Sequence, residues 1–525
     1  MSAPKVSPAG LKAWLNDGGE LAILDAREEG EFGTGHLFWA VPCPLSQAEL
    51  RAPRLVPRRS ARIVCVDGGQ GHAERLAGLL RSLGWSDVHV LQGGTAGWAA
   101  AGHEVFSGVN VPSKAFGEWV EHRYHTPSVD AAELHAMQAR GEDILIVDSR
   151  TPAEFRAMSI PGGISVPGAE LAYRVPSMLA RASTTVVVNC AGRTRSIMGA
   201  ESLRQAGLPN RVVALRNGTM GWELAGFRCA TGRTERHPQG VPPDAAESLA
   251  RARAFASRHG VRMIDPAGLA ALRADAGRTT YVLDVRDATE FAMGHLAGSV
   301  SAPGGQLVQA TDGWVAVRNA RIVLVDDTGT RAMMTAGWLR QLGGWDVFVL
   351  QGGLEGRLET ALPAVLPPAT PRIAVPELAA LLAEGAASVV DLQRSVAFRA
   401  GHIPGAVWGL RTRLGPLARR LPPDRRVVVV GPEPALAALA VVELRGLVRA
   451  PVAALEGGFE AWKAAGFPVA ADRADPPDEA CIDFYLRPYD RNHGVEQAMR
   501  AYLAWEIDLV QQLERDGDAR FGAWD

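Results

Sequence analysis

Short apolar runs recur along the chain, and each is followed by a polar loop and then by a helical pattern. Residues 185–189 form one such run, in which positions 185–188 are β-branched, and residues 197–205 beyond the next loop have apolar positions at helical spacing. Apolar runs of about four to five residues that alternate with helices predict βαβ units. Because the runs are almost entirely valine, isoleucine and leucine, we expect parallel sheets covered by helices on both faces.

The same pattern repeats along the chain, which is the main sign of its organisation. A strand ends in Asp-x-Arg and is followed by Glu-Phe and Gly-His. The versions of this strand end are Asp25-Ala26-Arg27, Asp148-Ser149-Arg150, Asp284-Val285-Arg286 and the degenerate Asp391-Leu392-Gln393. A second signature follows in each copy, at Leu91-Gln92-Gly93-Gly94, Leu215-Arg216-Asn217-Gly218, Leu350-Gln351-Gly352-Gly353 and Leu455-Glu456-Gly457-Gly458. The chain therefore contains four copies of one unit.

Proline and glycine concentrate between the copies and mark the predicted linkers. We expect domains at residues 1–108, 125–235, 258–366 and 370–472, with a C-terminal helical tail at 473–525. Helical spacing also predicts a linking helix over 113–124. Residues 494–514 read as an amphipathic helix, which we expect to pack on a domain face or on a partner helix.

These blocks resemble, in their order, the rhodanese (thiosulfate sulfurtransferase) family. The matching features are the Asp-x-Arg block, the Gly-His-Ile-Pro-Gly-Ala segment at 401–406, the loop after the third apolar strand and the Leu-x-Gly-Gly block. The resemblance covers about residues 1 to 472. It implies four tandem rhodanese-like domains, each a small parallel sheet flanked by helices, and an activity that transfers sulfane sulfur.

In that family the active cysteine lies where the central strand ends and a helix begins, and Cys190 occupies this place in the second copy. Alignment through the downstream helices puts Asp67, Asp326 and Gly431 at the same place in the first, third and fourth copies. Only the second copy is therefore expected to be active. Its loop predicts a substrate-binding set of Ala191, Gly192, Arg193, Thr194, Arg195 and Ser196.

A turn of this size can direct its backbone N–H groups inward at a helix N-terminus, where they hold an anion. A thiol in that position is expected to ionise more easily than a free cysteine, with Arg193 and Arg195 adding positive charge. We call this set of inward-facing N–H groups the cradle. An aspartate at the same position would accept their hydrogen bonds itself. Arg331 is a possible partner for Asp326. Arg150 and Glu154 are expected to pair near the site.

The span from Cys190 to Arg195 is six residues, the length that the resemblance associates with sulfur transfer, whereas related phosphatases carry a longer loop. The predicted reaction is a ping-pong transfer from thiosulfate or a low-molecular-weight persulfide, through a Cys190 persulfide, to a thiol or another thiophilic acceptor. It requires no metal and no organic cofactor.

Other interpretations of the same residues stay open. Cys190 can be a small buried hydrophobe in a non-catalytic scaffold or sulfur-carrier docking protein. A cysteine-dependent phosphatase or arsenate reductase uses a similar scaffold. The acceptor can also be a protein that docks on the inactive copies or on the C-terminal helix. Of the remaining thiols, Cys65 and Cys43 are expected in the core.

The composition of the chain argues against several classes of binding partner. A net charge of −2 gives no general attraction to nucleic acid or to an anionic membrane. No apolar run reaches the roughly 18 residues of a membrane span. Five widely spaced cysteines without a CxxC pair argue against a disulfide framework or a zinc site and favour a reducing, cytoplasmic location. The scarcity of lysine among the 55 basic residues suggests a bacterial source.

Overall fold

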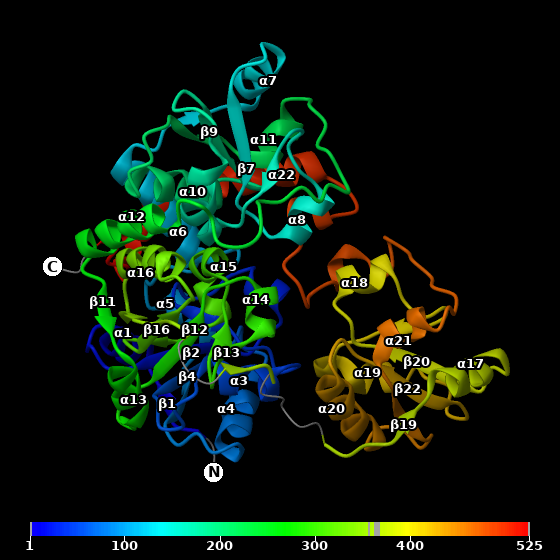
Figure 1. Cartoon of the computed structure of the whole chain (residues 1–525). Coiled ribbons are helices and arrows are strands. Elements are labelled where there is room, and N and C mark those ends of the chain that lie inside the picture. The colour runs from blue at the N-terminus through cyan, green and yellow to red at the C-terminus, as the bar shows by residue number, and fades with distance from the viewer. Residues whose placement is uncertain (1–2, 355–357, 362–367, 523–525) are drawn as a thin grey trace.

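The computed structural model describes residues 3–354, 358–361 and 368–522. Within these ranges the chain forms four similar α/β units, here called copies 1 to 4 in chain order (Figure 1). Copies 1 and 2 are joined by α6 (Val111–Tyr124), copies 2 and 3 by α12 (Ala245–Arg258), and a tail with α22 (Val495–Asp516) follows copy 4. The predicted α/β class, the small parallel sheets and the helical C-terminal region are confirmed. The predicted end of the third domain, residue 366, lies outside the described residues.

The main sheets of the four copies share one strand order, and the strands of each copy's main sheet run parallel. In copy 3 a separate pair, β13 (His295–Leu296) and β18 (Leu358–Glu359), is antiparallel. Copy 1 has β1 (Lys5–Val6), β5 (Val88–Leu91), β4 (Ile63–Val66), β2 (Leu21–Asp25) and β3 (Ala40–Pro42). Copy 2 has β6 (Ser128–Val129), β10 (Val212–Leu215), β9 (Thr185–Asn189), β7 (Ile144–Asp148) and β8 (Ile164–Ser165). Copy 3 has β11 (Arg262–Ile264), β17 (Asp346–Leu350), β16 (Arg321–Val325), β12 (Thr280–Asp284) and β14 (Val300–Ser301). Copy 4 has β19 (Arg372–Ile373), β23 (Val452–Leu455), β22 (Arg426–Val430), β20 (Ala387–Asp391) and β21 (Val407–Trp408).

Helices flank these sheets in every copy. Those of copy 1 are α1 (Pro8–Leu15), α2 (Glu29–Phe32), α3 (Ala48–Leu55), α4 (His72–Ser82) and α5 (Gly94–Ala100). Those of copy 2 are α7 (Ala131–Ala139), α8 (Pro152–Ala157), α9 (Leu171–Met178), α10 (Thr194–Gln205) and α11 (Gly218–Leu224). Copy 3 has α13 (Pro266–Ala274), α14 (Ala288–Met293), α15 (Gly304–Gln309) and α16 (Thr330–Leu342), and copy 4 has α17 (Val375–Ala383), α18 (Ser395–Ala400), α19 (Leu414–Ala418), α20 (Pro434–Arg445) and α21 (Gly458–Ala464).

The central strand of copy 2 shows why these sequences form covered sheets. Val186 and Val188 of β9 pack in the cluster that contains Leu203 of α10, whereas Val187 packs in a separate cluster with Leu134 of α7. Successive side chains of a strand point to opposite faces, so an unbroken valine run requires a helix layer on each side. The strand is buried along its whole length, and its carboxyl end therefore has a fixed position.

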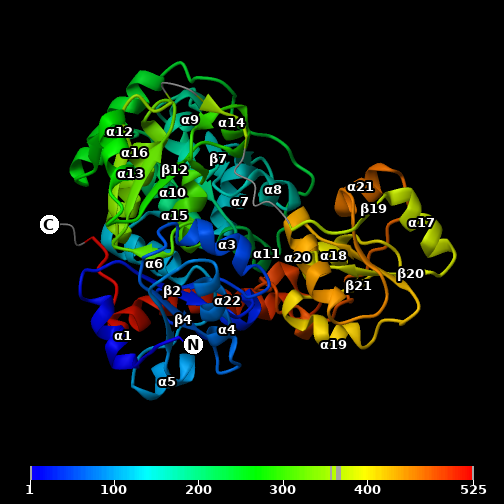
Figure 2. The same ribbon diagram turned by 90° about the horizontal axis from the view of Figure 1, so that it is seen from below.

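Copies 1, 2 and 3 pack together, while copy 4 lies to one side of them (Figures 1 and 2). A strand of copy 3, β15 (Val317–Arg318), adds antiparallel to β2 and extends the sheet of copy 1. The tail passes copy 4 and returns, so that α22 lies against α6, far away in sequence (Figure 2). The C-terminal helix therefore packs on a helix that belongs to none of the four sheets.

The Asp-x-Arg pairs are structural. In copy 2, Arg150 donates to both carboxylate oxygens of Asp148, with Nη2 2.7 Å from Oδ2, and to the carbonyl of Met158. Arg27 with Asp25 and Arg286 with Asp284 form the same buried arrangement in copies 1 and 3. The prediction that Arg150 pairs with Glu154 is wrong, because the guanidinium is used by the carboxylate two residues before it.

The histidines of the Gly-His pairs are also structural. The rings of His36, His295 and His402 stack on Phe32, Phe291 and Phe398, with centroids 3.8, 3.9 and 3.9 Å apart. Ser159 takes the equivalent place in copy 2, since it bridges to Ala230 as His36 does to Phe106. Aromatic stacking and backbone bridging account for these residues.

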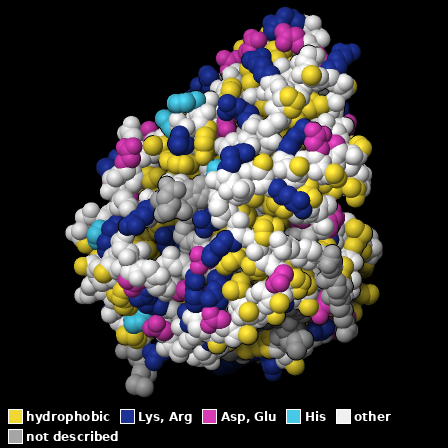
Figure 3. Space-filling view, turned by 60° about the vertical axis from the view of Figure 1, so that its left-hand side comes forward, with side chains coloured by type: hydrophobic (Ala, Val, Ile, Leu, Met, Phe, Trp, Pro, Cys, Tyr) yellow, Lys and Arg dark blue, Asp and Glu magenta, His cyan; other side chains and the backbone are white. Residues whose placement is uncertain are grey.

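Charges of both signs are interspersed with hydrophobic side chains on the face shown in Figure 3, in keeping with the small net charge. None of the helices in the described ranges is long and apolar enough to cross a membrane.

Copy 4 offers a test of the Asp-x-Arg pair, because Gln393 replaces the arginine. Its Nε2 donates to Oδ2 of Asp391 at 2.9 Å, and burial raises the pKa of Asp391 to about 6. A carboxyl whose pKa is higher in the folded state than in the unfolded state loses stabilisation as pH rises, here between about pH 4 and pH 6. At about 1.4 kcal/mol for each pKa unit, this loss is roughly 3 kcal/mol.

We expect Gln393→Arg to remove more than half of that pH dependence, because the added charge favours the ionised carboxylate. Hydrogen-exchange protection of β20 and β22, corrected for intrinsic exchange at each pH, measures it. Gln393→Met adds no charge and should keep the dependence. An unchanged pH profile in Gln393→Arg would contradict the assignment.

Candidate active site

Cys190 lies directly after β9 and four residues before α10 begins at Thr194. The amide of Thr219 donates to the Cys190 carbonyl at 2.9 Å, and the amide of Met220 donates to the Ala191 carbonyl at 3.0 Å. Gly218 has φ +54°, and a Cβ built there would stand 2.2 Å from the Cys190 carbonyl oxygen. Only glycine allows this approach, so the start of α11 holds the first residues of the loop in place.

The same contact identifies the equivalent position in every copy. A positive-φ glycine of the Leu-x-Gly-Gly block faces the carbonyl of one residue at the strand end. The pairs are Gly94 with Asp67, Gly218 with Cys190, Gly353 with Asp326 and Gly458 with Gly431. Cys190 is thus the one thiol among these four positions.

Aspartates fill the corresponding cradles of copies 1 and 3. Asp67 accepts hydrogen bonds from the amides of Gly69 and Ala73, at 2.8 and 3.1 Å. Asp326 accepts them from Gly329 and Ala332, the latter at 3.0 Å. The curve between strand and helix therefore does present N–H groups to an anion, and in these copies the anion belongs to the protein.

Arg331, the second residue of α16, compensates the carboxylates near the loop of copy 3. Its Nε lies 3.9 Å from Asp326, while Nη1 lies 2.7 Å from both Glu290 and Glu170. Glu170 belongs to copy 2. The expected proximity of Arg331 to Asp326 is present, and the same guanidinium also joins two copies.

The thiol of Cys190 is 2 % exposed and accepts a hydrogen bond from the hydroxyl of Ser196, 3.0 Å from Sγ. Burial raises the pKa of Cys190 above its ordinary value, and the charge of Glu506 raises it further. Arg195 and Ser196 act in the opposite direction and lower it. The expectation of an easily ionised thiol is therefore not met in this closed arrangement, because desolvation outweighs the cradle.

Arg195 does not face the thiol as an uncompensated charge. Its Nη1 and Nη2 lie 2.9 and 2.7 Å from the two carboxylate oxygens of Glu154. This pairing holds the pKa of Glu154 well below its usual range. Glu154, the acidic residue of the Glu-Phe block, therefore orients the arginine that closes the loop.

Arg193 points out of copy 2 toward the linking helix. It makes two 2.8 Å hydrogen bonds to Glu118 of α6 and another to Glu121. These carboxylates raise the pKa of Arg193 although burial lowers it. The loop was expected to gain net positive charge from this residue, but its guanidinium has two acidic partners.

Residues from outside copy 2 cover the loop, and the sequence analysis did not find them. Glu506 and the partly buried Tyr502 of α22 lie beside Gly192, and Glu506 also contacts Thr194. The buried Lys114 of α6 contacts both of these α22 side chains. A signal was present, since Glu506 interrupts the buried stripe of Met499, Leu503 and Leu509. A carboxylate in the apolar face of an amphipathic helix requires a partner, but the sequence did not show where that partner lies.

The other cysteines lie in different surroundings. Cys65 in β4 and Cys43 are completely buried, and burial raises their pKa values, to about 12 for Cys43. The pKa of Cys229 is also raised to about 12, by burial and by Glu223. Among the described residues no group of His, Cys, Asp and Glu is arranged to hold a metal ion.

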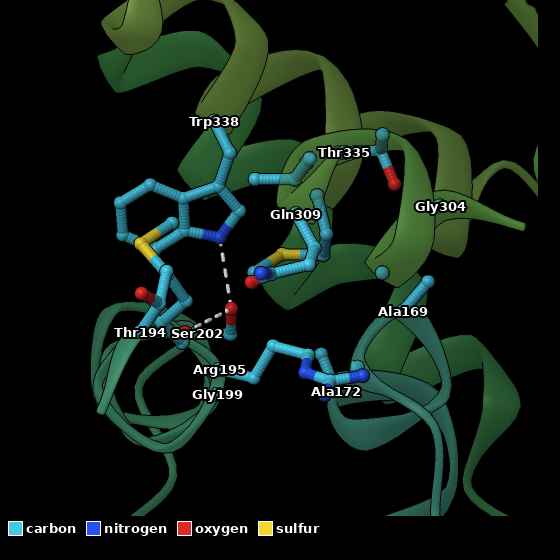
Figure 4. Close-up of a pocket in the computed structure, with 15 residues that line it drawn as sticks. Ala169, Ala172, Thr194, Arg195, Gly199, Ser202, Gly304, Gln309, Thr335 and Trp338 are labelled. Carbon is cyan, nitrogen blue, oxygen red and sulfur yellow. Dashed lines mark hydrogen bonds between the residues drawn. The ribbon is translucent and has the colours of Figure 1, made fainter. Parts of the chain in front are cut away.

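A mainly apolar cavity lies beside the loop, between copies 2 and 3 (Figure 4). Thr194, Arg195 and Ser202 line it from copy 2, and Trp338 and Gly304 line it from copy 3. The indole Nε1 of Trp338 donates to Ser202 at 2.8 Å. Copy 3 therefore forms one wall next to the loop of Cys190.

Comparison with known proteins agrees with this architecture. The Rhodanese-like domain family matches residues 7–101, 130–225, 265–359 and 374–465, and the chain belongs to that family. The crystal structure of thiosulfate sulfurtransferase from Pseudomonas aeruginosa is 45 % identical, with a TM-score of 0.90 over 99 % of both chains.

Two curated relatives match single regions. A protein named sulfurtransferase from Allochromatium vinosum is 33 % identical over 99 residues, which are 19 % of this chain and 90 % of the relative. The probable adenylyltransferase/sulfurtransferase MoeZ of Mycobacterium tuberculosis is 33 % identical over 96 residues, 18 % of this chain. The match spans about a quarter of MoeZ, 24 % of its length.

Ser196→Ala tests the electrostatics of the loop. Loss of the hydroxyl donor should raise the pKa of Cys190 further, since a hydrogen bond to a charged group contributes roughly 1.5–3 kcal/mol before relaxation. The pH profile of iodoacetamide labelling of Cys190, followed by peptide mass spectrometry, measures this shift.

Ser202→Ala is the matched control in α10, because Ser202 donates to the carbonyl of Met198 and not to the thiol. It should leave the labelling profile in place. A profile that is the same for Ser196→Ala and the unmodified protein would show that the hydroxyl does not stabilise the thiolate.

Proposed function

We propose that this protein is a sulfurtransferase in which Cys190 carries sulfane sulfur from thiosulfate or a low-molecular-weight persulfide to a thiophilic acceptor. The observation that carries the proposal is the position of Cys190. Among the four equivalent strand ends it alone offers a nucleophile, and two others hold aspartates on the amides that an anion would use. The names of the Pseudomonas and Allochromatium relatives support the same activity.

The proposed first step is attack of the Cys190 thiolate on the outer sulfur of the donor. With thiosulfate, the sulfur–sulfur bond breaks and its electron pair leaves on sulfite, so that Cys190 becomes a persulfide anion. Arg195 and the Ser196 hydroxyl, which both favour a negative charge at Sγ, would stabilise the reacting thiolate. Amides at the start of α10 would hold the persulfide.

In the second step an acceptor, such as a thiolate or cyanide in an assay, attacks the outer sulfur of the persulfide. The electron pair of the sulfur–sulfur bond returns to Sγ and restores the enzyme. Two displacements on one cysteine give ping-pong kinetics. All of the steps proposed here use side chains and amides of copy 2.

We propose a supporting role for the other copies, in domains close to 1–108, 258–366 and 370–472. The carboxylates of Asp67 and Asp326 occupy the N–H groups that a substrate anion would need. Copy 4 has Gly431-Pro432 at the strand end, which lacks both a nucleophile and one backbone donor. These copies would build the walls around copy 2 rather than transfer sulfur.

Intact-mass analysis after incubation with thiosulfate, followed by peptide mapping, tests the proposal. The protein should gain the mass of one sulfur atom on the peptide that contains Cys190, and Cys190→Ser should not. Activity in a thiosulfate–cyanide assay should fall by at least about a thousandfold in Cys190→Ser, the scale on which enzymes lose a covalent nucleophile.

Cys229→Ser is the matched control, because Cys229 is the partly exposed thiol of the chain. It should retain the adduct and the activity. An adduct that persists in Cys190→Ser, or hydrolysis of a phosphate ester that depends on Cys190, would refute sulfur transfer through this residue.

A further inference from the structure

Three polar side chains form a closed cluster over the loop of Cys190, here called the roof cluster: Lys114, Tyr502 and Glu506. The ammonium of Lys114 donates to the Tyr502 hydroxyl and, at 3.4 Å, to Oε1 of Glu506. The Tyr502 hydroxyl donates to the same carboxylate oxygen at 3.1 Å. All three lie in the linking helix or the tail, outside the sheet unit that contains the cysteine.

Glu506 contacts the loop with both carboxylate oxygens. Oε1 also accepts from the Thr194 hydroxyl at 3.3 Å. Oε2 is buried and has no hydrogen-bond donor among the described residues, in a side chain that is 2 % exposed. A Cβ built on Gly192 would stand 2.9 Å from Oε2, so this oxygen lies directly on the loop that cradles the thiol. A buried acceptor without a donor is costly, which indicates that a ligand supplies the donor.

The charges around the loop do not favour a doubly charged anion. Lys114, Arg193 and Arg195 each have a carboxylate partner: Lys114 has Glu506, Arg195 has Glu154, and Arg193 has Glu118 and Glu121. A dianion that reaches Cys190 would depend on the loop amides and would meet the carboxylate of Glu506. A hydropersulfide, R–S–SH, has less charge and carries an S–H group that can donate to Oε2.

We infer that Glu506 is a specificity-determining residue that selects hydropersulfide donors over the thiosulfate dianion. This inference rests on the sulfur transfer proposed above and specifies its donor. The Cys190 thiolate attacks the outer sulfur of R–S–SH, the sulfur–sulfur bond breaks, and its electron pair leaves as the thiolate R–S⁻. The proton stays on the transferred sulfur, which becomes Cys190–S–SH and keeps its hydrogen bond to Glu506.

Glu506→Gln tests the inference because it removes the charge and keeps the shape. With thiosulfate as donor, kcat/KM should rise about tenfold, since a like charge no longer opposes the dianion. With cysteine persulfide as donor, kcat/KM should stay level or fall, because the amide can turn its NH2 group toward the S–H. The ratio of the two values should therefore change by at least about tenfold in favour of thiosulfate.

Two further variants separate specificity from folding. Glu506→Asp retains the charge and should keep the preference for the persulfide even if overall activity falls. Glu496→Gln makes the same change in α22 on an exposed residue paired with Arg500, and it should behave like the unmodified protein. Thermal unfolding of each variant shows whether the substitution changes the stability of the fold.

A readout without any donor complements the kinetics. The negative charge of Glu506 opposes ionisation of Cys190, beside the favourable action of Arg195 and Ser196. In Glu506→Gln the labelling of Cys190 by iodoacetamide should therefore begin at lower pH. A damaged fold would instead expose all thiols, including Cys65.

A parallel fall with both donors, or an unchanged ratio, would overturn the inference. These results differ from a failure of the proposed function. If neither donor places sulfur on Cys190 of the unmodified protein, sulfur transfer itself is wrong. If both donors place sulfur on Cys190 but the ratio of their kcat/KM values is the same in Glu506→Gln, only the selection by this carboxylate is wrong.

Discussion

The side chains of Asp67, Cys190 and Asp326 occupy the curve between a strand end and the first turn of a helix, where inward-facing N–H groups require a negative partner. The curve keeps its shape because a glycine with positive φ lets the next helix approach the strand-end carbonyl. In copies 1 and 3 an aspartate satisfies the amides from within. A neutral cysteine supplies no negative charge, so the amides of copy 2 can bind either the ionised thiolate or an anion from outside the protein. This difference in the strand-end residue distinguishes copy 2 from copies 1 and 3.

Burial of the loop then controls how easily the thiol of Cys190 ionises. Helices α6 and α22 close over the loop and exclude water, so every charge nearby needs a partner. The result is a set of compensated pairs: Arg195 with Glu154, Arg193 with Glu118, and Lys114 with Glu506. The cradle favours a thiolate while desolvation opposes it, and the reactivity of Cys190 depends on this balance.

Copy 3, which has an aspartate in place of the cysteine, contributes to the structure through its contacts with copies 1 and 2. Copy 3 supplies Trp338 to the cavity beside the loop, and its Arg331 binds Glu170 of copy 2. It also supplies the strand β15 to the sheet of copy 1.

The sequence alone determined the four copies, the parallel α/β class, the C-terminal helix and the single thiol at the strand ends. These features depend on local hydrophobic pattern and on residues within one unit, so they can be read along the chain. The partners of the charged residues could not be predicted from the sequence. Arg150 pairs with Asp148 rather than Glu154, and Glu506 reaches Gly192 from the far end of the chain. Only the tertiary structure decides which charges meet and how deeply the thiol is buried, and it is this burial that sets the direction of the Cys190 pKa.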